Sequence, residues 1–509
     1  MIKTTQKITV SMLILCFAVV SAFSNNVKVE NVRLRNQNTT ADTKEVEFDL
    51  SWENSWRTSA APSNYDACWI FAKYRLTSAS AWNHVTLSTT GGDHTAPSGS
   101  SIEAVGDGKG IFIYRSADGS GNNDWDDIRL QWTYGVDGLA DSDSVEIAVF
   151  AIEMVYIPEG SFDLGDGNGV SESTQGFELA ATDNLSITIT NALSALIETD
   201  ASLTYDDAQL GSTGIYLDGD GGIDLNGDGD FADANENGSF PVGYNAMYCM
   251  KYEVSQGQYV DFVNKLDASQ TSVLIAAEAI ARQNIAGSGN SWASSTPNRP
   301  KDLGIYDLWA YLDWAALRPM TETEFEKICR GSNAALTGEY PWGTTNLYTS
   351  AYTLSLDGTE EEVITNPGSA TGNASYATTD GSLDGPLRCG IFAASSGNHT
   401  REETGGTFYG VMEMGGNLSE VVVFLGDPDG RSFDGSNGDG AIAATGYANQ
   451  AGWPAYDGLD NNLNDGGATV RGGYYGQTNT YMRVSDRFNV AAHPGAGSNA
   501  YGGRGVRNQ

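Results

Sequence analysis

RPMTETEFEKICRG, residues 318–331, is the stretch of this sequence that says most about its fold. Thr321 can cap a helix that begins after it, and Glu324 follows three positions later, which is the spacing of a capping box. Phe325 and Ile328 lie three residues apart, so they share one face of that helix and are candidates for a core. The stretch therefore predicts the start of a helix with one apolar face.

A second stretch, KYEVSQGQYVDFVNKL, repeats this device at residues 251–266. Ser255 and Gln258 have the spacing of a capping box. Three further residues fall on one face of the expected helix: Tyr259, Phe262 and Val263. This region therefore predicts another short amphipathic helix.

Shorter segments complete a series of landmarks along the chain. They are MVYIPEGSF (154–162), YPWG (340–343), GVMEMGGNLSEV (410–421), RGGY (471–474) and GVR (505–507). Each alone predicts only a strand, a turn or a helix start, so the information lies in their order. In this order, and with the two stretches above, they resemble the landmarks of the sulfatase-modifying-factor family, whose best-known member is the formylglycine-generating enzyme.

The resemblance implies an α+β fold with much irregular structure, a variant of the C-type lectin fold, over residues 153–509, with a long acidic insertion at about 166–240. Residues 25–152 differ, because their short segments alternate apolar and polar residues between glycine-rich turns. Such alternation indicates half-buried strands, and about six to eight of them favour an antiparallel β-sandwich domain. The last segment runs into residue 154 without a flexible linker, so we expect the two domains to be docked tightly.

The N-terminus predicts a secretory signal peptide over residues 1–24. Lys3 and Lys7 precede an apolar run, and Ala22 and Ser24 provide the small residues of a cleavage site. The run is too short to span a bilayer comfortably, and no other long apolar run follows it. We therefore expect a secreted protein, in the periplasm, on the outer-membrane surface or outside the cell, with no transmembrane segment after signal cleavage.

The formal net charge is −37, from 28 basic and 65 acidic side chains. Such a surface repels phosphate backbones and anionic lipid heads, so nucleic acid is not an expected partner. It favours cations, although solubility in a salty medium is the simpler explanation. The cysteines left after the expected cleavage match no disulfide framework, which favours buried free thiols at Cys68, Cys249, Cys329 and Cys389.

The resemblance does not extend to the catalytic residues. Oxidase members of the family use two cysteines shortly after an Arg-Gly-Gly-Ser segment, because a thiolate pair holds copper in its reduced state. Here Gln477 and Met482 stand at those positions, Tyr474 replaces the serine, and no cysteine follows Cys389. Related sulfur-inserting enzymes use an iron site with histidines, whereas the histidines of this chain are few and scattered. We therefore expect neither copper nor iron, and no formylglycine-generating oxidase activity.

The calcium-binding features of the family are better preserved. The first expected ion takes its ligands from Glu413, the carbonyls of Gly416 and Leu418, and Glu420. The second takes them from Asn373, Ala374, Asp384 and Pro386. Separately, an acidic stretch matches the first half of an EF-hand loop at Asp224, Asn226 and Asp228, with Asp230 at the carbonyl position. Hard oxygen ligands in glycine-bearing turns suit Ca²⁺, and the alternative is that these carboxylates only cap turns or solvate an insertion.

These features favour a secreted, non-catalytic binding or structural protein of the bacterial cell envelope, built on a Ca²⁺-stabilised scaffold, with an unidentified protein or glycan as partner. Two alternatives stay open. One is an enzyme with altered, copper-independent chemistry in a pocket lined by Tyr474, Tyr475, Gln477, Arg483, Asp486 and Arg487, although internal salt bridges are the simpler role for these charges. The other is glycan binding through calcium, as in C-type lectins, but no Glu-Pro-Asn or Gln-Pro-Asp tripeptide supports it.

Overall fold

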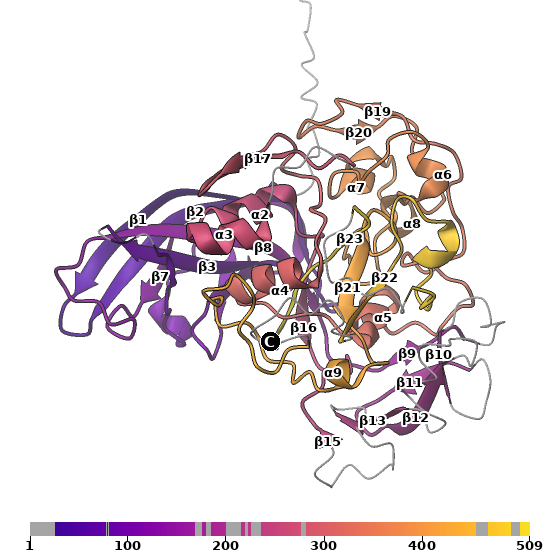
Figure 1. Ribbon diagram of the computed structural model, residues 1–509, viewed down its shortest axis with the longest axis horizontal. Coiled ribbons are helices and arrows are strands. Elements are labelled where there is room, and N and C mark those ends of the chain that lie inside the picture. The colour runs from indigo at the N-terminus through magenta and orange to yellow at the C-terminus, as the bar shows by residue number, and fades with distance from the viewer. Residues whose placement is uncertain are drawn as a thin grey trace, which may run out of the picture.

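The protein is described by a computed structural model (Figure 1). The described residues are 26–77, 79, 81–167, 176–179, 185–199, 215–218, 222–224, 236–275, 281–454, 467–489 and 499–509. The expected signal peptide lies outside them. Among these residues, no helix combines the length and the apolar character needed to cross a bilayer.

Two antiparallel sheets make up the N-terminal part of the fold. The first contains β1 (Lys28–Asn38), β2 (Thr43–Arg57) and β7 (Gly119–Trp132), in the order β1-β2-β7. The second contains β3 (Asp66–Leu76), β4 (Asn83–His84), β5 (Ser100–Ala104), β6 (Ile111–Arg115), β8 (Val145–Ile157), β16 (Met247–Met250) and β24 (Val506–Asn508), with the order β24-β16-β8-β3-β6-β5 and β4 beside β3. The strands predicted from alternation before residue 152 are therefore present.

Apolar side chains from both sheets form a shared core. Phe48 and Trp52 of β2 and Ile128 of β7 belong to the same buried cluster as Ile70 of β3 and Ile113 of β6. Because alternate residues of a strand point to opposite faces, each sheet turns one apolar face toward the other. The core thus explains the alternating pattern of the sequence.

The strand β8 joins this part to the landmark region. It passes without a break through residue 152, and its end pairs with β16, with Met154 opposite Met250 and Ile157 opposite Met247. The strand β16 in turn pairs with β24 near the end of the chain, where Cys249 lies opposite Val506. The expected tight junction is confirmed, because the two parts share one sheet.

The other elements are short and are separated by irregular segments. The helices are α2 (Gln256–Val263), α3 (Ala268–Leu274), α4 (Ile305–Trp314), α5 (Glu322–Arg330), α6 (Ala377–Asp380), α7 (Ile391–Ser395), α8 (Arg401–Thr404) and α9 (Pro428–Arg431), with short 3-10 helices at Gly91–Asp93 and Asn479–Met482. The strands are β9 (Phe162–Leu164), β10 (Phe177–Leu179), β11 (Ile187–Ile189), β12 (Ser194–Thr199), β13 (Ile215–Asp218), β14 (Ile223–Asp224), β15 (Glu236–Asn237), β17 (Ile285–Ser288), β18 (Ser291–Ser294), β19 (Leu354–Ser355), β20 (Val363–Ile364), β21 (Ser419–Val423), β22 (Ala468–Arg471) and β23 (Tyr501–Gly502). Strands of the acidic insertion form a small sheet at one end of the molecule, in the order β10-β12-β13-β14-β15 (Figure 1).

Both predicted capping boxes are confirmed. At α2 the Gln258 amide donates to Ser255 Oγ at 3.2 Å, and the Ser255 amide donates to Gln258 Oε1 at 2.9 Å. At α5 the Glu324 amide donates to Thr321 Oγ1 at 3.2 Å, and the Thr321 amide donates to Glu324 Oε2 at 3.0 Å. Each box satisfies amide groups that a helix start leaves without a partner, so the sequence defines where both helices begin.

Candidate cation site and the region after Arg471

Two glutamates of α5 enter a buried ion-pair network. Glu322 and Glu326 lie one turn apart, so they point to the same side of the helix. Glu322 Oε1 accepts a hydrogen bond from Arg487 Nε at 2.9 Å, and Glu326 Oε1 accepts one from Arg471 Nη2 at 2.9 Å. All four side chains are buried. Because removing one partner would leave a buried charge uncompensated, these pairs tie α5 to β22 and to the segment that follows it.

This network fixes the arginine end of the predicted pocket. Arg487 forms an ion pair with Glu322, and its guanidinium lies 4.1 Å from the centroid of the Phe177 ring. Asp486 is buried beside it, and burial raises the pKa of its carboxyl to about 7. Arg483 is half-buried. Arg487 therefore forms an internal salt bridge, which is the simpler role that the sequence analysis considered for these charges.

The tyrosine end of the predicted pocket lies at the glycine-asparagine turn. The rings of Tyr474 and Tyr475 meet edge to face, with centroids 5.3 Å apart. The Tyr475 amide donates to the Asn417 carbonyl at 3.0 Å, and Gln477 Oε1 accepts from the Tyr474 amide at 3.3 Å. The structure thus groups Tyr474, Tyr475 and Gln477 beside the turn, and a ligand pocket formed with Arg483, Asp486 and Arg487 stays a prediction.

The positions expected to hold the catalytic cysteines have other roles here. Gln477 is half-buried and supports the turn at Tyr474 through the hydrogen bond just described. Met482 is buried in an apolar cluster with Tyr340 and Trp342 of the YPWG landmark. Neither side chain is a thiolate, so these two positions do not supply the thiolate pair that oxidase members of the family use.

The first expected calcium site contains an internal cation. Glu420 of β21 is buried, and its Oε1 atom accepts a hydrogen bond from Arg504 Nε at 2.8 Å. Arg504 also donates to backbone carbonyls of Lys251 at 3.0 Å and Met412 at 2.9 Å. The guanidinium therefore connects the landmarks at residues 251–266 and 410–421 through one carboxylate and several carbonyl groups.

Two more carboxylates surround this pair. Glu413 has a φ of 54°, and its Oε1 atom accepts from the Gly390 amide at 2.8 Å. Glu253, from the landmark at residues 251–262, accepts from Asn417 Nδ2 at 2.7 Å and from the Leu418 amide at 3.0 Å. Burial raises the pKa of Glu413 to about 7 and that of Glu253 well above its usual range. Each carboxyl is therefore hard to ionise in this environment without a compensating cation.

The residues of this cluster fit a calcium ion. Glu413 Oε2 and Glu420 Oε2 are buried, and neither has a hydrogen-bond partner in the described part of the chain. Hard oxygen atoms are what Ca²⁺ binds, and a bound ion would add to the positive charge that Arg504 already brings to Glu420. Glu413 and Glu420 would hold it with the carbonyls of Gly416 and Leu418. No three His, Cys, Asp or Glu side chains converge as a metal site among the described residues, so this candidate depends on carbonyl ligands.

The structure also identifies two residues that the sequence analysis missed. Glu253 stands within a recognised landmark, so its place in the series was a signal that could have been used. Arg504 directly precedes the GVR landmark and had no such signal, because its pairing with Glu420 joins positions 84 residues apart.

The second expected calcium site fits an ion less well. Asn373 Oδ1 accepts from the Tyr352 hydroxyl at 3.0 Å and from the Gly368 amide at 2.8 Å. The Ala374 carbonyl accepts from Thr379 Oγ1 at 2.7 Å. Asp384 is exposed. Of these predicted ligands, the two buried ones are already engaged by protein groups.

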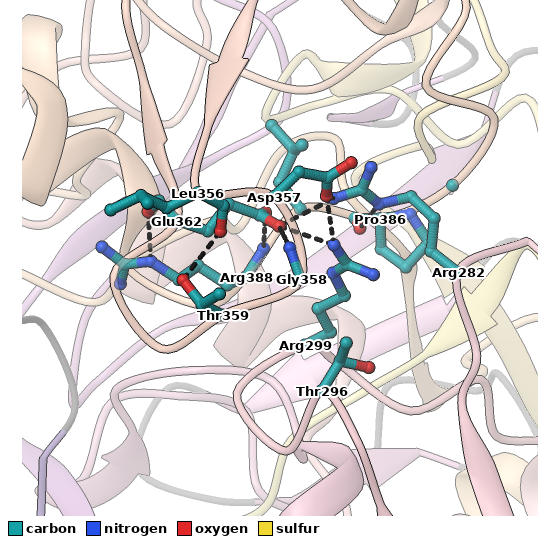
Figure 2. A network of polar contacts seen from close by, with 12 residues as sticks. Arg282, Thr296, Arg299, Leu356, Asp357, Gly358, Thr359, Glu362, Pro386 and Arg388 are labelled. Carbon is teal, nitrogen blue, oxygen red and sulfur yellow. Dashed lines mark hydrogen bonds and ion pairs between the residues drawn. The ribbon is translucent and has the colours of Figure 1, made fainter.

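Pro386, the fourth predicted ligand of that site, belongs to an arginine cluster shown in Figure 2. Its carbonyl accepts from Arg282 Nε at 3.0 Å. The guanidinium groups of Arg282 and Arg299 both contact the carboxylates of Asp357 and Glu362, with Arg282 Nη2 at 2.9 Å from each. The Pro386 carbonyl and the two nearby carboxylates are therefore already in contact with arginine side chains.

The EF-hand-like stretch is described only at its first position. Asp224 lies at the end of β14, buried, opposite Tyr216 of β13 and Glu236 of β15. Asn226, Asp228 and Asp230 lie outside the described residues. A calcium loop at this place stays a prediction.

Four cysteines expected as buried thiols are buried, and none of them forms a disulfide in the part of the chain that the structure describes: Cys68, Cys249, Cys329 and Cys389. Burial raises the pKa of the Cys249 thiol to about 12 and also raises the pKa values of the other three thiols. Thiolates are the reactive form of cysteine, so these side chains are chemically inert in the fold.

The α5 network and the turn around Asn417 define a mixed α/β domain of the formylglycine-generating-enzyme type. A family model described as "Sulfatase-modifying factor enzyme 1-like domain" matches residues 220–509. That match covers more than half of the chain, and the protein belongs to this family. The resemblance seen in the sequence is thereby confirmed. Comparison with curated proteins gives no match.

Proposed function

We propose that this protein is a secreted, non-catalytic binding or structural protein of the bacterial cell envelope. The observation that carries the proposal is the residue pair Gln477 and Met482 at the positions of the catalytic cysteines. Function resides in the site and not in the fold, so family membership alone does not imply oxidase chemistry. The expected partner is a protein or glycan of the envelope.

The proposed scaffold is stabilised by Ca²⁺ at the cluster of Glu413 and Glu420. Support comes from the two buried, unpartnered carboxylate oxygens and from the raised pKa of Glu413. In this proposal residues 25–152 form a β-sandwich domain, and residues 153–509 adopt a variant C-type lectin fold. The location outside the cytoplasm rests on the signal peptide expected at residues 1–24.

The test of the non-catalytic role is an oxidation assay. The full chain is incubated with copper, oxygen, a thiol reductant and a sulfatase-type cysteine peptide, and the peptide is analysed by mass spectrometry. The proposal predicts no formylglycine above a control without protein, because the thiolate pair is missing. Formylglycine that depends on the protein contradicts the proposal.

A further inference from the structure

A cavity of about 280 Å³ lies where the N-terminal sheets meet the helices of the family region. Its lining residues come from β1, β3, β8, α2 and α4 and from the residues that flank β1 and α2. It is separate from the cation cluster and from the segment after Arg471, neither of which contributes a lining residue. Its volume is near the lower end of ligand pockets, which suits a molecule about the size of one sugar ring.

One wall of this cavity is aromatic. Phe150, Tyr311 and Trp314 line it, and the rings of Phe150 and Trp314 meet with centroids 4.9 Å apart. The Tyr311 hydroxyl and the Trp314 indole nitrogen make no hydrogen bond to any described residue. Neither atom is completely inaccessible to solvent. Tyr311 and Trp314 are almost fully buried, whereas Phe150 is half-buried, so Phe150 provides most of the exposed ring surface of this wall.

The polar part of the lining comes from α2 and from the segment that directly follows it. Gln258, Asp261 and Lys265 line the cavity, whereas Tyr259 and Phe262 of the same helix are buried in the core. The Asp261 carboxylate and the Gln258 amide nitrogen have no hydrogen-bond partner among the described residues. Asp261 is an exposed residue, and desolvation of its carboxyl by the surrounding side chains raises its pKa.

These groups select a neutral, polyhydroxylated ligand. A hydroxyl both donates and accepts, so neighbouring hydroxyls suit the acceptor Asp261 and the donors Gln258 and Lys265. The carboxylate and the ammonium group offset each other, so the cavity does not favour a ligand of either charge. The C–H face of a sugar ring would pack against Phe150, since binding sites combine apolar walls with a few placed polar groups.

We propose that this junction cavity binds a neutral sugar residue, held by Asp261 and Gln258 against the aromatic wall. This inference goes beyond the proposed function and does not depend on the cation site. It also differs from lectin-type recognition, because no calcium ion bridges the sugar. Its failure therefore leaves the scaffold proposal unaffected.

The test is saturation-transfer NMR on the full chain, in EDTA, with D-glucose, D-galactose and N-acetyl-D-glucosamine as probes. Choline and acetate serve as charged probes. At least one sugar is expected to bind, with choline and acetate giving no signal. Asp261→Ala should weaken that binding at least about tenfold, as expected for loss of hydrogen bonds to a charged group. Asp126→Ala, at an exposed position of β7, is the matched control and should bind like the parent.

Asp261→Asn keeps the shape of the side chain, and it replaces Asp261→Ala in the binding test if the alanine variant unfolds. Three results overturn the proposal: none of the three sugars binds, a charged probe binds in their place, or both Asp261 variants bind sugar as the parent does. Sugar binding that requires calcium and is lost in Glu413→Gln would also overturn it, because that result places the sugar at the cation cluster.

Discussion

Arg504 donates a hydrogen bond from Nε to Glu420 Oε1 at 2.8 Å, and both side chains are buried. The pair joins the end of the chain to the turn that carries the expected calcium ligands. Glu413 and Glu420 both raise the pKa of Glu253, whereas Arg504, Arg388 and Lys251 lower the pKa of Glu413. Burial still raises the pKa of all three carboxyl groups, so a proton or a bound cation stabilises the cluster.

The first prediction concerns this ion pair. In EDTA, Glu420→Gln should lower the free energy of unfolding by about 3–5 kcal/mol, because Arg504 then remains buried without its carboxylate. The double variant Glu420→Gln with Arg504→Met should recover part of the loss, since the buried guanidinium that lacks its carboxylate is removed, while Glu253 and Glu413 lose a neighbouring cation. Denaturant titrations measure both values. A double variant that is as unstable as the single one would show that the charge imbalance is not the cause.

The second prediction concerns the buried network of α5. Arg487→Lys should lower the free energy of unfolding by about 1–3 kcal/mol, because lysine cannot make both hydrogen bonds that the guanidinium makes to Glu322. Arg483→Lys, at a half-buried neighbour, is the matched control and should change it little. Equal effects of the two substitutions in denaturant titrations would contradict the assigned role of Arg487.

The third prediction concerns pH. Burial raises the pKa of Asp313 from 3.8 to about 7. The folded protein therefore keeps a proton that the unfolded chain loses above about pH 4, and the stability that Asp313 contributes falls as the pH rises from about 4 to about 7. Each pKa unit corresponds to about 1.4 kcal/mol.

Asp313→Asn should remove this dependence. The difference in free energy of unfolding, variant minus parent, should increase from pH 5 to pH 8, because only the parent loses stability over this range. Denaturant titrations at both pH values measure this difference. Asp126→Asn is the exposed control and should keep the parent's dependence. If the difference between Asp313→Asn and the parent is the same at both pH values, the pKa assigned to Asp313 is wrong.

The fourth prediction concerns the cysteines. Because all four thiols are buried and their pKa values are raised, a thiol reagent should label none of them in the folded, signal-free chain. In denaturant all four should react. Rapid labelling of the folded protein, or fewer than four reactive thiols after unfolding without reductant, would contradict the assignment of buried free cysteines.

The local features of the sequence predicted local structure well. The capping boxes at Ser255 and Thr321 defined both helix starts, since their hydrogen bonds span only three residues. The shared sheet could not be predicted from the sequence, because the pairing of β8 with β16 joins segments about 90 residues apart. No short sequence pattern specifies that register. The role of Arg504 could not be predicted either, because its partner Glu420 is distant in the sequence.

The candidate calcium ligands illustrate the same limit. Glu413 and Glu420 could be selected from one short landmark, and the structure leaves an oxygen of each without a partner. Asn373 and Pro386 were selected by the same comparison, but tertiary neighbours such as Tyr352 and Arg282 engage their oxygen atoms. Ligand type can thus be predicted from sequence, whereas competition from other side chains depends on the fold.

The proposed calcium-stabilised scaffold is tested by the melting temperature of the protein in Ca²⁺ and in Mg²⁺ at matched ionic strength. Ca²⁺ bound to the folded state alone should raise it, and Mg²⁺, which loses water reluctantly, should raise it less. Glu413→Gln should reduce the calcium effect, whereas Glu360→Gln, at an exposed glutamate, should keep it. Equal effects of the two ions, or a calcium effect unchanged in Glu413→Gln, would contradict the claim.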